Sequence, residues 1–433
     1  MTLQVQGLSA TSGRRQRILI AGAGPAGWAA AGELRRLGFS GEVLVVGGEP
    51  VAPYDRTACS KGLLDGSSKP SETWLDVSDC PGVDWRLGRL VVDLAPAAKM
   101  VVTDTGDCYP YDGLVIATGA RVALPTGWPR GEPGMHMLRD MADVQALRRD
   151  LRDARRVVVV GGGITGCEVA AAIRDMAREV IIVDSGPCLM ARALGKPVGE
   201  LVTAEIVCAG IGIRLQRRVL RVDRKSGSWR VRLDDGTDLW ADLVVAAVGE
   251  RPETSWLTNS GLDISDGVLC EHSMKVPGVR DIVVAGAVAR WPNPAYGVAP
   301  QRIGQWVSAI EQGQAAARAL VLPQIRRPPV SILPRFSSEQ LGLRIQVCGY
   351  ISGGDEAWLT ELRPRRRDKA RAGLVANYFH QGRLTGVVAV NAPRAFAVAT
   401  RSLLAVPRNG MAPMAPVNRS SVVSRSSWPV AVG

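Results

Sequence analysis

The stretch Gly22–Gly27 reads GAGPAG and lies between a short apolar run, Ile18–Ala21, and a predicted helix, Trp28–Leu37. A glycine-containing turn then leads to a second apolar run, Val43–Val46. A dinucleotide-binding fold requires strand, glycine turn, helix and strand in this order. The first glycine makes the tight turn, and the second lets the backbone approach a pyrophosphate. The third lets the helix pack on the strand, with its positive N-terminus at the phosphates.

The same order recurs in the middle of the chain. The predicted strand Arg156–Val160 precedes Gly161–Gly166, which reads GGGITG, and a predicted helix over Cys167–Met176 leads to the strand Val180–Val183. One such glycine motif is weak evidence, because glycine-rich turns occur in many loops, but two complete frames are strong evidence. Two frames predict two bound dinucleotides, and the usual pair is FAD with NADH or NADPH.

Two later segments share one design, a buried strand that ends in a turn of small residues. They are Tyr111–Ala120 and Asp242–Pro252, and each can close one nucleotide domain and return the chain to its neighbour. We therefore predict an α/β fold with two Rossmann-like dinucleotide-binding domains and a small C-terminal α+β domain. The predicted limits are 14–125 with 249–325 for a discontinuous FAD-binding domain, 126–248 for the NAD-binding domain, 326–408 for the C-terminal domain and 409–433 for a disordered tail. Strands of the C-terminal domain are predicted near 343–350, 374–379 and 384–390.

Composition narrows the class of protein. The eight cysteines are scattered with no C-x-x-C, and the three histidines, His136, His272 and His380, are isolated, so no metal site is expected. Each histidine is predicted to be a surface or turn residue. Residues 1–17 lack an apolar signal core, and no apolar run reaches the roughly 20 residues of a membrane span, so we expect a cytoplasmic protein that binds no membrane. The formal net charge of +12 favours an anionic partner.

Three further motifs carry a resemblance to a known family. They are Pro53–Arg56 followed by Ser60-Lys61, Arg302-Ile303 leading to Trp306 and Glu311–Gly313, and Ser338–Gln340 followed by Leu343–Val347. With them, the chain resembles the FAD-dependent ferredoxin and rubredoxin reductases, of the putidaredoxin reductase and biphenyl-dioxygenase ferredoxin reductase type, over about residues 17–404.

The resemblance implies roles for individual residues. Arg56 and Lys61 are expected to contact the flavin or its phosphates, where positive charge also stabilises a reduced, anionic flavin. Glu168 is expected near the nicotinamide, and Trp306 beside the flavin and nicotinamide, which makes Glu168, Trp306 and Lys61 the expected catalytic residues. The expected cofactor-binding residues are Gly22, Gly24, Pro25, Ala26, Gly27, Glu49, Arg56, Lys61, Ala117, Thr118, Gly119, Gly161, Gly163, Ile164, Gly166, Glu168, Asp184, Gly249, Gly286 and Trp306.

Asp184 bears on the choice of nicotinamide cofactor. It ends the second strand of the second frame, where an acid can accept hydrogen bonds from both ribose hydroxyls of NADH. The next residues, Ser185–Pro187, include no arginine to receive a 2′-phosphate, so NADH is expected in preference to NADPH. Glu49 is the expected ribose contact of the FAD fold, although Gly47-Gly48 displaces it from the strand end.

The chain departs from the family pattern at three positions. Ala287 stands where the family has an Asp that hydrogen-bonds the flavin ribityl chain. Gly304 stands where the Arg-x-Glu of the Trp306 motif places its acid, and Ser337 stands where the C-terminal motif usually carries Trp. A charge-assisted hydrogen bond is worth about 1.5–3 kcal/mol, so the missing ribityl contact predicts roughly ten- to hundredfold weaker flavin binding.

The function expected first is NADH-dependent transfer of electrons, through FAD, to an acidic ferredoxin-type iron–sulfur protein, with the reductase a monomer or homodimer. A basic run, Arg363–Arg371, is a candidate docking surface for this partner; it lacks the interleaved aromatic residues of a nucleic-acid site, so no nucleic acid is expected. One alternative is an NADH oxidase or peroxidase that uses Cys59, although a small buried side chain is the commoner role. Another is a degenerate, flavin-poor homologue that acts as a binding or regulatory subunit, which Ala287 and Gly304 favour.

Overall fold

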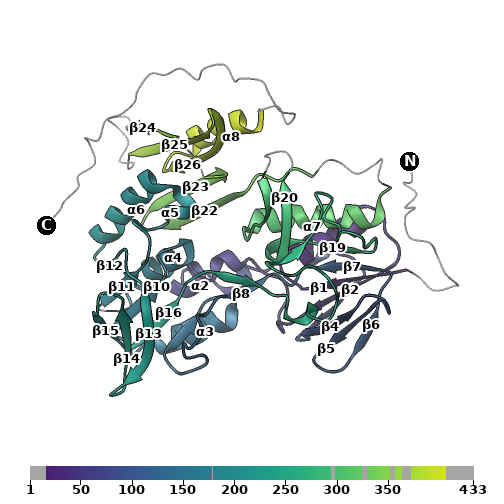
Figure 1. Ribbon diagram of the computed structural model, residues 1–433, viewed down its shortest axis with the longest axis horizontal. Coiled ribbons are helices and arrows are strands. Elements are labelled where there is room, and N and C mark those ends of the chain that lie inside the picture. The colour runs from purple at the N-terminus through teal and green to yellow at the C-terminus, as the bar shows by residue number, and fades with distance from the viewer. Residues whose placement is uncertain are drawn as a thin grey trace. The chain divides into compact units, whose positions relative to one another are not determined.

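The computed structural model describes residues 16–177, 179–293, 298–323, 330–351, 356–362 and 372–405 (Figure 1). These residues form two compact units. The first unit contains the described residues of Met1–Asp55, Pro70–Arg121 and Glu250–Pro334, and the second contains those of Arg56–Lys69, Val122–Gly249 and Arg335–Gly433. None of the helices in the described part of the chain is long and apolar enough to span a membrane.

The first unit is built around a parallel sheet with the strand order β19-β7-β1-β2-β3. The strands are β1 (Arg17–Ala21), β2 (Glu42–Gly47), β3 (Val83–Leu87), β7 (Gly113–Ile116) and β19 (Ile282–Val284). The three central strands are almost entirely apolar and buried, as expected for a parallel sheet that is covered on both faces. The sequence patterns predicted β1 and β2 to within one residue at each end.

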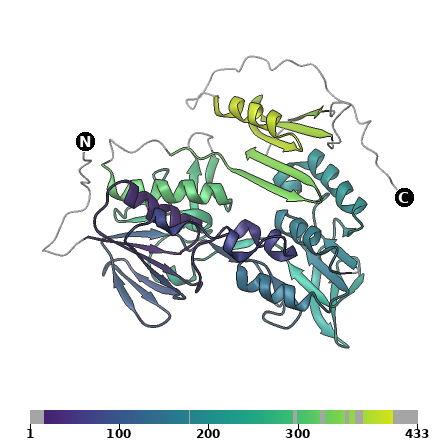
Figure 2. The same cartoon turned by 180° about the vertical axis from the view of Figure 1, so that it is seen from behind.

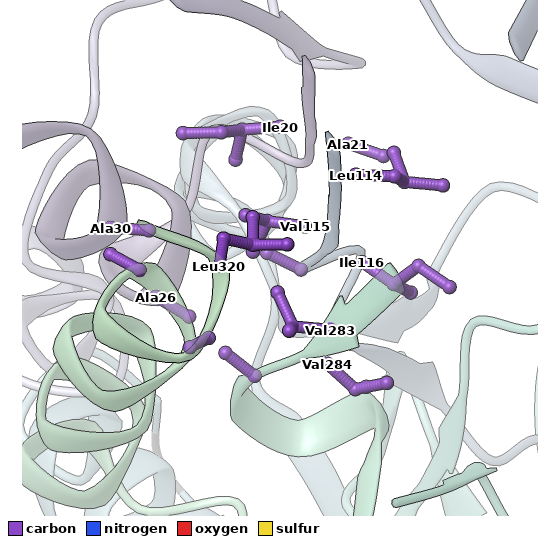
Figure 3. Close-up of a cluster of buried hydrophobic side chains, with 14 of the residues drawn as sticks. Ile20, Ala21, Ala26, Ala30, Leu114, Val115, Ile116, Val283, Val284 and Leu320 are labelled. Carbon is purple, nitrogen blue, oxygen red and sulfur yellow. The ribbon is translucent and has the colours of Figure 1, made fainter. Parts of the chain in front are cut away.

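Helices α1 (Pro25–Arg36) and α7 (Trp306–Val321) pack against each other in this unit and lie side by side in both views (Figures 1 and 2). Small side chains make the close packing possible. Figure 3 shows Ala26 and Ala30 of α1 in one cluster with Leu320 of α7 and the central strands, and the labelled residues in it are buried. This apolar core fixes the end of β1 from which the first glycine turn leaves.

Smaller sheets complete the first unit. They are the meander β4 (Val91–Ala95), β5 (Met100–Thr103) and β6 (Cys108–Pro110), the pair β8 (Ala120–Val122) and β17 (Glu250–Pro252), and the sheet β18 (Val268–Leu269), β20 (Ala289–Asn293) and β21 (Val298–Arg302).

The second unit repeats the parallel design, with the strand order β12-β11-β10-β16-β9. Its strands are β9 (Met135–Met137), β10 (Arg156–Val160), β11 (Glu179–Val183), β12 (Gly212–Arg214) and β16 (Leu243–Ala246), and a meander follows as β13 (Val219–Lys225), β14 (Ser228–Leu233) and β15 (Asp238–Ala241). Its helices are α2 (Gly62–Asp65), α3 (Met141–Asp150), α4 (Ile164–Ile173), α5 (Ala191–Leu194) and α6 (Lys196–Cys208).

The C-terminal part of the second unit is an antiparallel sheet with the order β22-β23-β26-β25-β24, packed against helix α8 (Pro393–Ala405). The strands are β22 (Arg335–Gln340), β23 (Leu343–Gly349), β24 (Glu356–Leu362), β25 (Gly373–His380) and β26 (Arg383–Val390). Two-residue turns join β22 to β23 and β25 to β26, and both residues of each turn have positive φ, as in a type I′ hairpin.

The expected fold class is confirmed, and the three strands predicted in the C-terminal domain are present as β23, β25 and β26. The sequence patterns did not predict β22 and β24. The strand β22 reads RFSSEQ, so it lacks the apolar alternation of a half-buried strand, yet Ser338 and Gln340 are buried there.

The prediction for His136 was wrong. This histidine lies within β9, is buried, and pairs through Nε2 with Asp150 Oδ2 at 3.0 Å. Asp150 is 14 residues away at the end of α3, so no local pattern marks the pair. The basic run 363–371 and the tail 409–433 lie outside the described residues, and the domain limits remain predictions.

Candidate functional site

Both glycine turns have the backbone geometry that their sequences predict. Gly22 has φ +116°, and a Cβ there would overlap the carbonyl of Ala117; a Cβ on Gly27 would overlap the carbonyl oxygen of Gly22. In the second unit, Gly161 has φ +107°, and Gly166 lies against it as Gly27 lies against Gly22. Each turn is therefore closed so tightly that only glycine fits at its first and last positions.

The helix starts behind these turns are open. Gly24 caps α1 and Gly163 caps α4, and within the described part of the chain neither helix start has a side-chain capping bond. A Cβ built on either glycine would have no described atom within 4 Å, apart from those of its own neighbours in the chain. Pro25 and Ala26 begin α1, and Ile164 begins α4. The backbone N–H groups and the positive end of the helix dipole are thus available to an anion at two separate sites, which fits one pyrophosphate in each unit.

Asp184 follows β11, as predicted, and its carboxylate is bound by the turn itself. Oδ2 accepts a hydrogen bond from the backbone N–H of Gly162 at 2.6 Å, and Oδ1 accepts one from that of Gly186, also at 2.6 Å. A carboxylate has about four acceptor positions, so capacity for ribose hydroxyls remains. The sequence indicated a ligand contact for Asp184 and gave no sign that it also fixes the glycine turn.

Glu168, in the first turns of α4, is the centre of a buried polar cluster. Its carboxylate accepts hydrogen bonds from the hydroxyls of Ser60 and, at 2.5 Å, Ser338, and Lys61 Nζ lies 3.0 Å from Oε1. These groups come from three distant parts of the chain. Two hydroxyls and one ammonium group thus surround a carboxylate that is only 4% exposed, so that each of its oxygens has a polar partner within the protein.

The structure brings Lys61 and Glu168 together, and their catalytic role remains a proposal. Sequence reasoning named neither Ser60 nor Ser338 as a partner of Glu168, although both stand in the quoted motifs. Beside the cluster is a cavity of about 470 Å³, whose lining includes Lys61, Glu168, Asp65, Glu339 and Arg344. Acidic and basic groups therefore meet around one concave surface in the second unit.

Arg56 also belongs to the second unit. Its Nη1 donates to the carbonyl oxygen of Arg139 at 3.3 Å, and Lys61 Nζ donates to the carbonyl oxygen of Thr57 at 3.2 Å. Arg148 Nη1 donates to the carbonyl oxygen of Leu63 at 2.8 Å, which ties helix α3 to the same segment. Residues 56–69 are thus held by the second unit, although the glycine turn that precedes them in sequence belongs to the first.

The remaining expected flavin contacts lie mainly in the first unit. Glu49 accepts a hydrogen bond from the buried Tyr54 hydroxyl at 2.7 Å. Thr118, which lies between Ala117 and Gly119 in the sequence, donates to the carbonyl oxygen of Glu253 at 2.8 Å. Gly286 donates its N–H to Gln312 Oε1 at 2.8 Å. Trp306 is the half-buried first residue of α7. Gly249 lies in the second unit and accepts from the N–H of Ala123 at 2.9 Å.

Residues 16–313 of this chain match the family described as pyridine nucleotide-disulphide oxidoreductase, which is well over half of its length. The chain belongs to this family. Residues 335–412 also match a domain described as reductase C-terminal, so the small C-terminal domain expected from the sequence is a recognised part of such proteins.

Curated relatives of this family share sequence along most of the chain. The benzene 1,2-dioxygenase system ferredoxin–NAD(+) reductase subunit of Pseudomonas putida is 31% identical over 89% of this chain and 91% of its own length. The rubredoxin–NAD(+) reductase of Pseudomonas putida is 30% identical over 78% of this chain and 88% of its own length. The expected resemblance to ferredoxin and rubredoxin reductases is thereby confirmed.

A solved structure extends the likeness to the fold. The covalent putidaredoxin reductase–putidaredoxin complex matches with a TM-score of 0.80 and 26% identity, over 90% of this chain and 93% of the matched chain. Members of the pyridine nucleotide-disulphide oxidoreductase family and the ferredoxin–NAD(+) reductases use FAD and NADH, so the two expected cofactors are confirmed. The class of the protein is likewise confirmed as an oxidoreductase.

Proposed function

We propose that this protein passes electrons from NADH, through FAD, to a small acidic iron–sulfur protein of the ferredoxin type. The observation that carries the proposal is the presence of two closed glycine turns, each with an uncapped helix start, in a chain that also brings Lys61 to Glu168. Each of the two turns would bind one dinucleotide. Bound FAD would accept a hydride from NADH and release single electrons to the partner.

The residues of this chain would bind and orient the two cofactors. The turn Gly22–Gly27 and the start of α1 would hold the pyrophosphate of FAD, and the turn Gly161–Gly166 with α4 that of NADH. Lys61 would present a positive charge toward the flavin, and Glu168 would keep its ammonium group in one place. The hydroxyls of Ser60 and Ser338 occupy two further acceptor positions of Glu168, and this carboxylate would act as an anchor for Lys61.

The absorbance spectrum of the purified protein tests the proposal first. We expect a flavin spectrum, with partial loss of FAD on dilution because Ala287 offers no ribityl carboxylate. NADH should bleach this spectrum anaerobically, and an acidic [2Fe–2S] ferredoxin should then be reduced. Failure to bind FAD, even with excess FAD present, would overturn the proposal in favour of a flavin-poor binding subunit.

Cys59 provides the test against a thiol-using oxidase or peroxidase. Its side chain is 3% exposed, which agrees with the expected role of a small buried residue. We expect Cys59→Ser to keep at least about half of the NADH-dependent reduction of ferricyanide, since hydride and single-electron transfer through FAD need no thiol. Loss of nearly all activity in a variant that still binds FAD would move the assignment to the thiol-using class.

A further inference from the structure

Arg302, at the end of β21, is a largely buried cation of the first unit. Its Nε donates to Asp266 Oδ1 at 2.9 Å, and its Nη1 donates to the carbonyl oxygen of Ala287 at 3.5 Å. Only 18% of the side chain is exposed. A guanidinium group withdrawn from water to this extent needs acids beside it, and the position of each such acid therefore matters for the local fold.

Glu250, the first residue of β17, provides the second acid. Its Oε1 lies 3.9 Å from Arg302 Nη1, and its carbonyl oxygen accepts a hydrogen bond from Arg302 Nη2 at 3.5 Å. The same carboxylate lies over Gly304, where an added Cβ would overlap Oε1. The three heavy atoms nearest to such a Cβ all belong to the carboxyl end of Glu250. Gly304 does not have a positive φ, so its backbone conformation would accept any residue.

This geometry bears on two departures noted in the sequence and accounts for the one at position 304. The family resemblance described above implies acids at 287 and 304, and this chain has Ala287 and Gly304 there. Position 287 touches Arg302 through its carbonyl oxygen, and position 304 lies two residues beyond Arg302 in the chain. The carboxylate of Glu250, a residue 54 positions earlier in the chain, thus lies where a side chain at position 304 would begin.

We propose that Glu250 is a positioning residue for the flavin. It supplies from β17 the carboxylate that the family resemblance implies at position 304, and Gly304 is needed to admit it. The inference rests on the proposed function, because it assumes that FAD binds beside Trp306 and Ala287. Glu250 would hold Arg302 against the carbonyl of Ala287 and keep one negative charge at the start of α7.

Two effects follow for bound FAD. Without the Glu250 carboxylate, Arg302 loses one of its two acids and the segment at Ala287 is held less firmly, so oxidised FAD should bind about fivefold more weakly, the effect of one ordinary hydrogen bond. Removal of a negative charge near the flavin also favours the reduced, anionic form. The flavin midpoint potential should therefore become more positive.

The experiment compares Glu250→Gln, Gly304→Ala and the exchange Glu250→Ala/Gly304→Glu with the wild type. The measurements are FAD affinity of the apoprotein, flavin midpoint potential and thermal unfolding. Gly304→Ala should resemble Glu250→Gln, because its methyl group displaces the flexible end of Glu250 at little cost in stability. The exchange should return the potential and the affinity to near the wild-type values. Glu253→Gln is the matched control, since it removes the same charge three residues away, from a carboxylate that pairs with Arg121.

The outcomes separate the two claims. If the wild type binds no FAD, the proposed function and this inference both fall. If the wild type binds FAD and Glu250→Gln shifts neither affinity nor potential more than Glu253→Gln does, the inference alone is wrong. A merely structural role is recognised by a lower unfolding temperature with an unchanged flavin potential, and it would also overturn the inference.

Discussion

At the scale of single residues, the most instructive side chain is Asp184. Its two carboxylate oxygens hold the N–H groups of Gly162 and Gly186, so the charge is fixed at the end of β11 and cannot turn away from a ligand. A 2′-phosphate placed at the adenosine ribose would meet this negative charge directly. Discrimination between NADH and NADPH should then depend on the net charge at this point.

We predict that wild-type flavin is reduced faster by NADH than by NADPH, and that Ser185→Arg lowers this preference by about tenfold, since a new guanidinium can pair with the phosphate. Stopped-flow measurement of flavin reduction with each cofactor provides the ratio. Asp184→Asn is the comparison, which removes the charge but leaves only one acceptor oxygen for two N–H groups, and it should lower the unfolding temperature as well. A wild type that prefers NADPH would show that the assignment of Asp184 is wrong.

How much could be predicted from sequence differs sharply among these residues. The glycine turns were predictable because their constraint is local: Gly22 and Gly27 touch each other within one turn. The partners of Glu168 were not, because Ser60 and Ser338 lie 108 and 170 residues away from it. The contact between Glu250 and Gly304 likewise leaves no local pattern. Absence of an acid at position 304 was visible in the sequence, but its replacement was not.

At the scale of elements, helices α1 and α7 are joined by a buried charged group. The side chain of Glu33 on α1 is 2% exposed, and its Oε1 lies 2.6 Å from Arg318 Nε on α7 and 2.6 Å from Arg36 Nη2. Burial raises the pKa of Glu33, but the hydrogen bonds from Arg36 and Arg318 outweigh it, so that the pKa is lowered overall. The carboxylate is therefore stabilised in its charged form by the packing of the two helices.

We predict that Glu33→Gln reduces the free energy of unfolding by roughly 1.5–3 kcal/mol, the range for hydrogen bonds to charged groups, because two arginines lose the negative charge of their shared acceptor. Urea titration followed by circular dichroism measures this difference. Glu42→Gln, which removes the exposed partner of Arg17, is the control and should cost less than about 1 kcal/mol. Equal losses for the two variants would contradict a special role for the buried carboxylate.

The pair of β9 and α3 carries a pH-dependent contribution to stability. Burial lowers the pKa of His136, against the opposing influence of Asp150, which raises it, while Arg149 lowers it further. Since the unfolded chain then binds a proton more readily than the folded one, this contribution is present above the ordinary histidine pKa of about 6.5 and is lost as the pH falls below it.

We accordingly expect the free energy of unfolding to fall between pH 7.5 and pH 5.5, and His136→Asn to flatten that slope. Urea titrations at the two pH values, on wild type and variant, provide the comparison. His272→Asn is the control, because His272 is exposed in a turn and should leave the slope as it is. An unchanged slope in His136→Asn would place the pH dependence on other groups.

At the scale of the whole molecule, the net charge of +12 is the feature most relevant to a partner protein. Transfer of single electrons requires only a brief complex, and opposite charges speed the encounter between two proteins. Such steering weakens as the Debye length falls from about 10 Å at 0.1 M salt to about 3 Å at 1 M.

We predict that reduction of an acidic ferredoxin slows steeply with added salt, while flavin reduction by NADH changes little. The two rates are separable by stopped-flow mixing at matched salt concentrations. Neutralising Arg365, Arg366 and Arg367 together tests whether the basic run 363–371 belongs to the docking surface. Ferredoxin reduction that is indifferent to salt, in an otherwise active enzyme, would leave the charge without a role in partner binding.

The division of the first unit into three stretches has a consequence for synthesis on the ribosome. Strand β7 receives its outer neighbour β19, and α1 receives α7, only after the chain has been made as far as Val321. Until then, the apolar side chains of Leu114, Val115 and Ile116 lack some of the partners that bury them in the finished protein. The nascent first unit therefore stays incomplete while the segment that forms β9 to β16 is synthesised and can fold. We expect this interval to be the period in which the chain depends most on molecular chaperones.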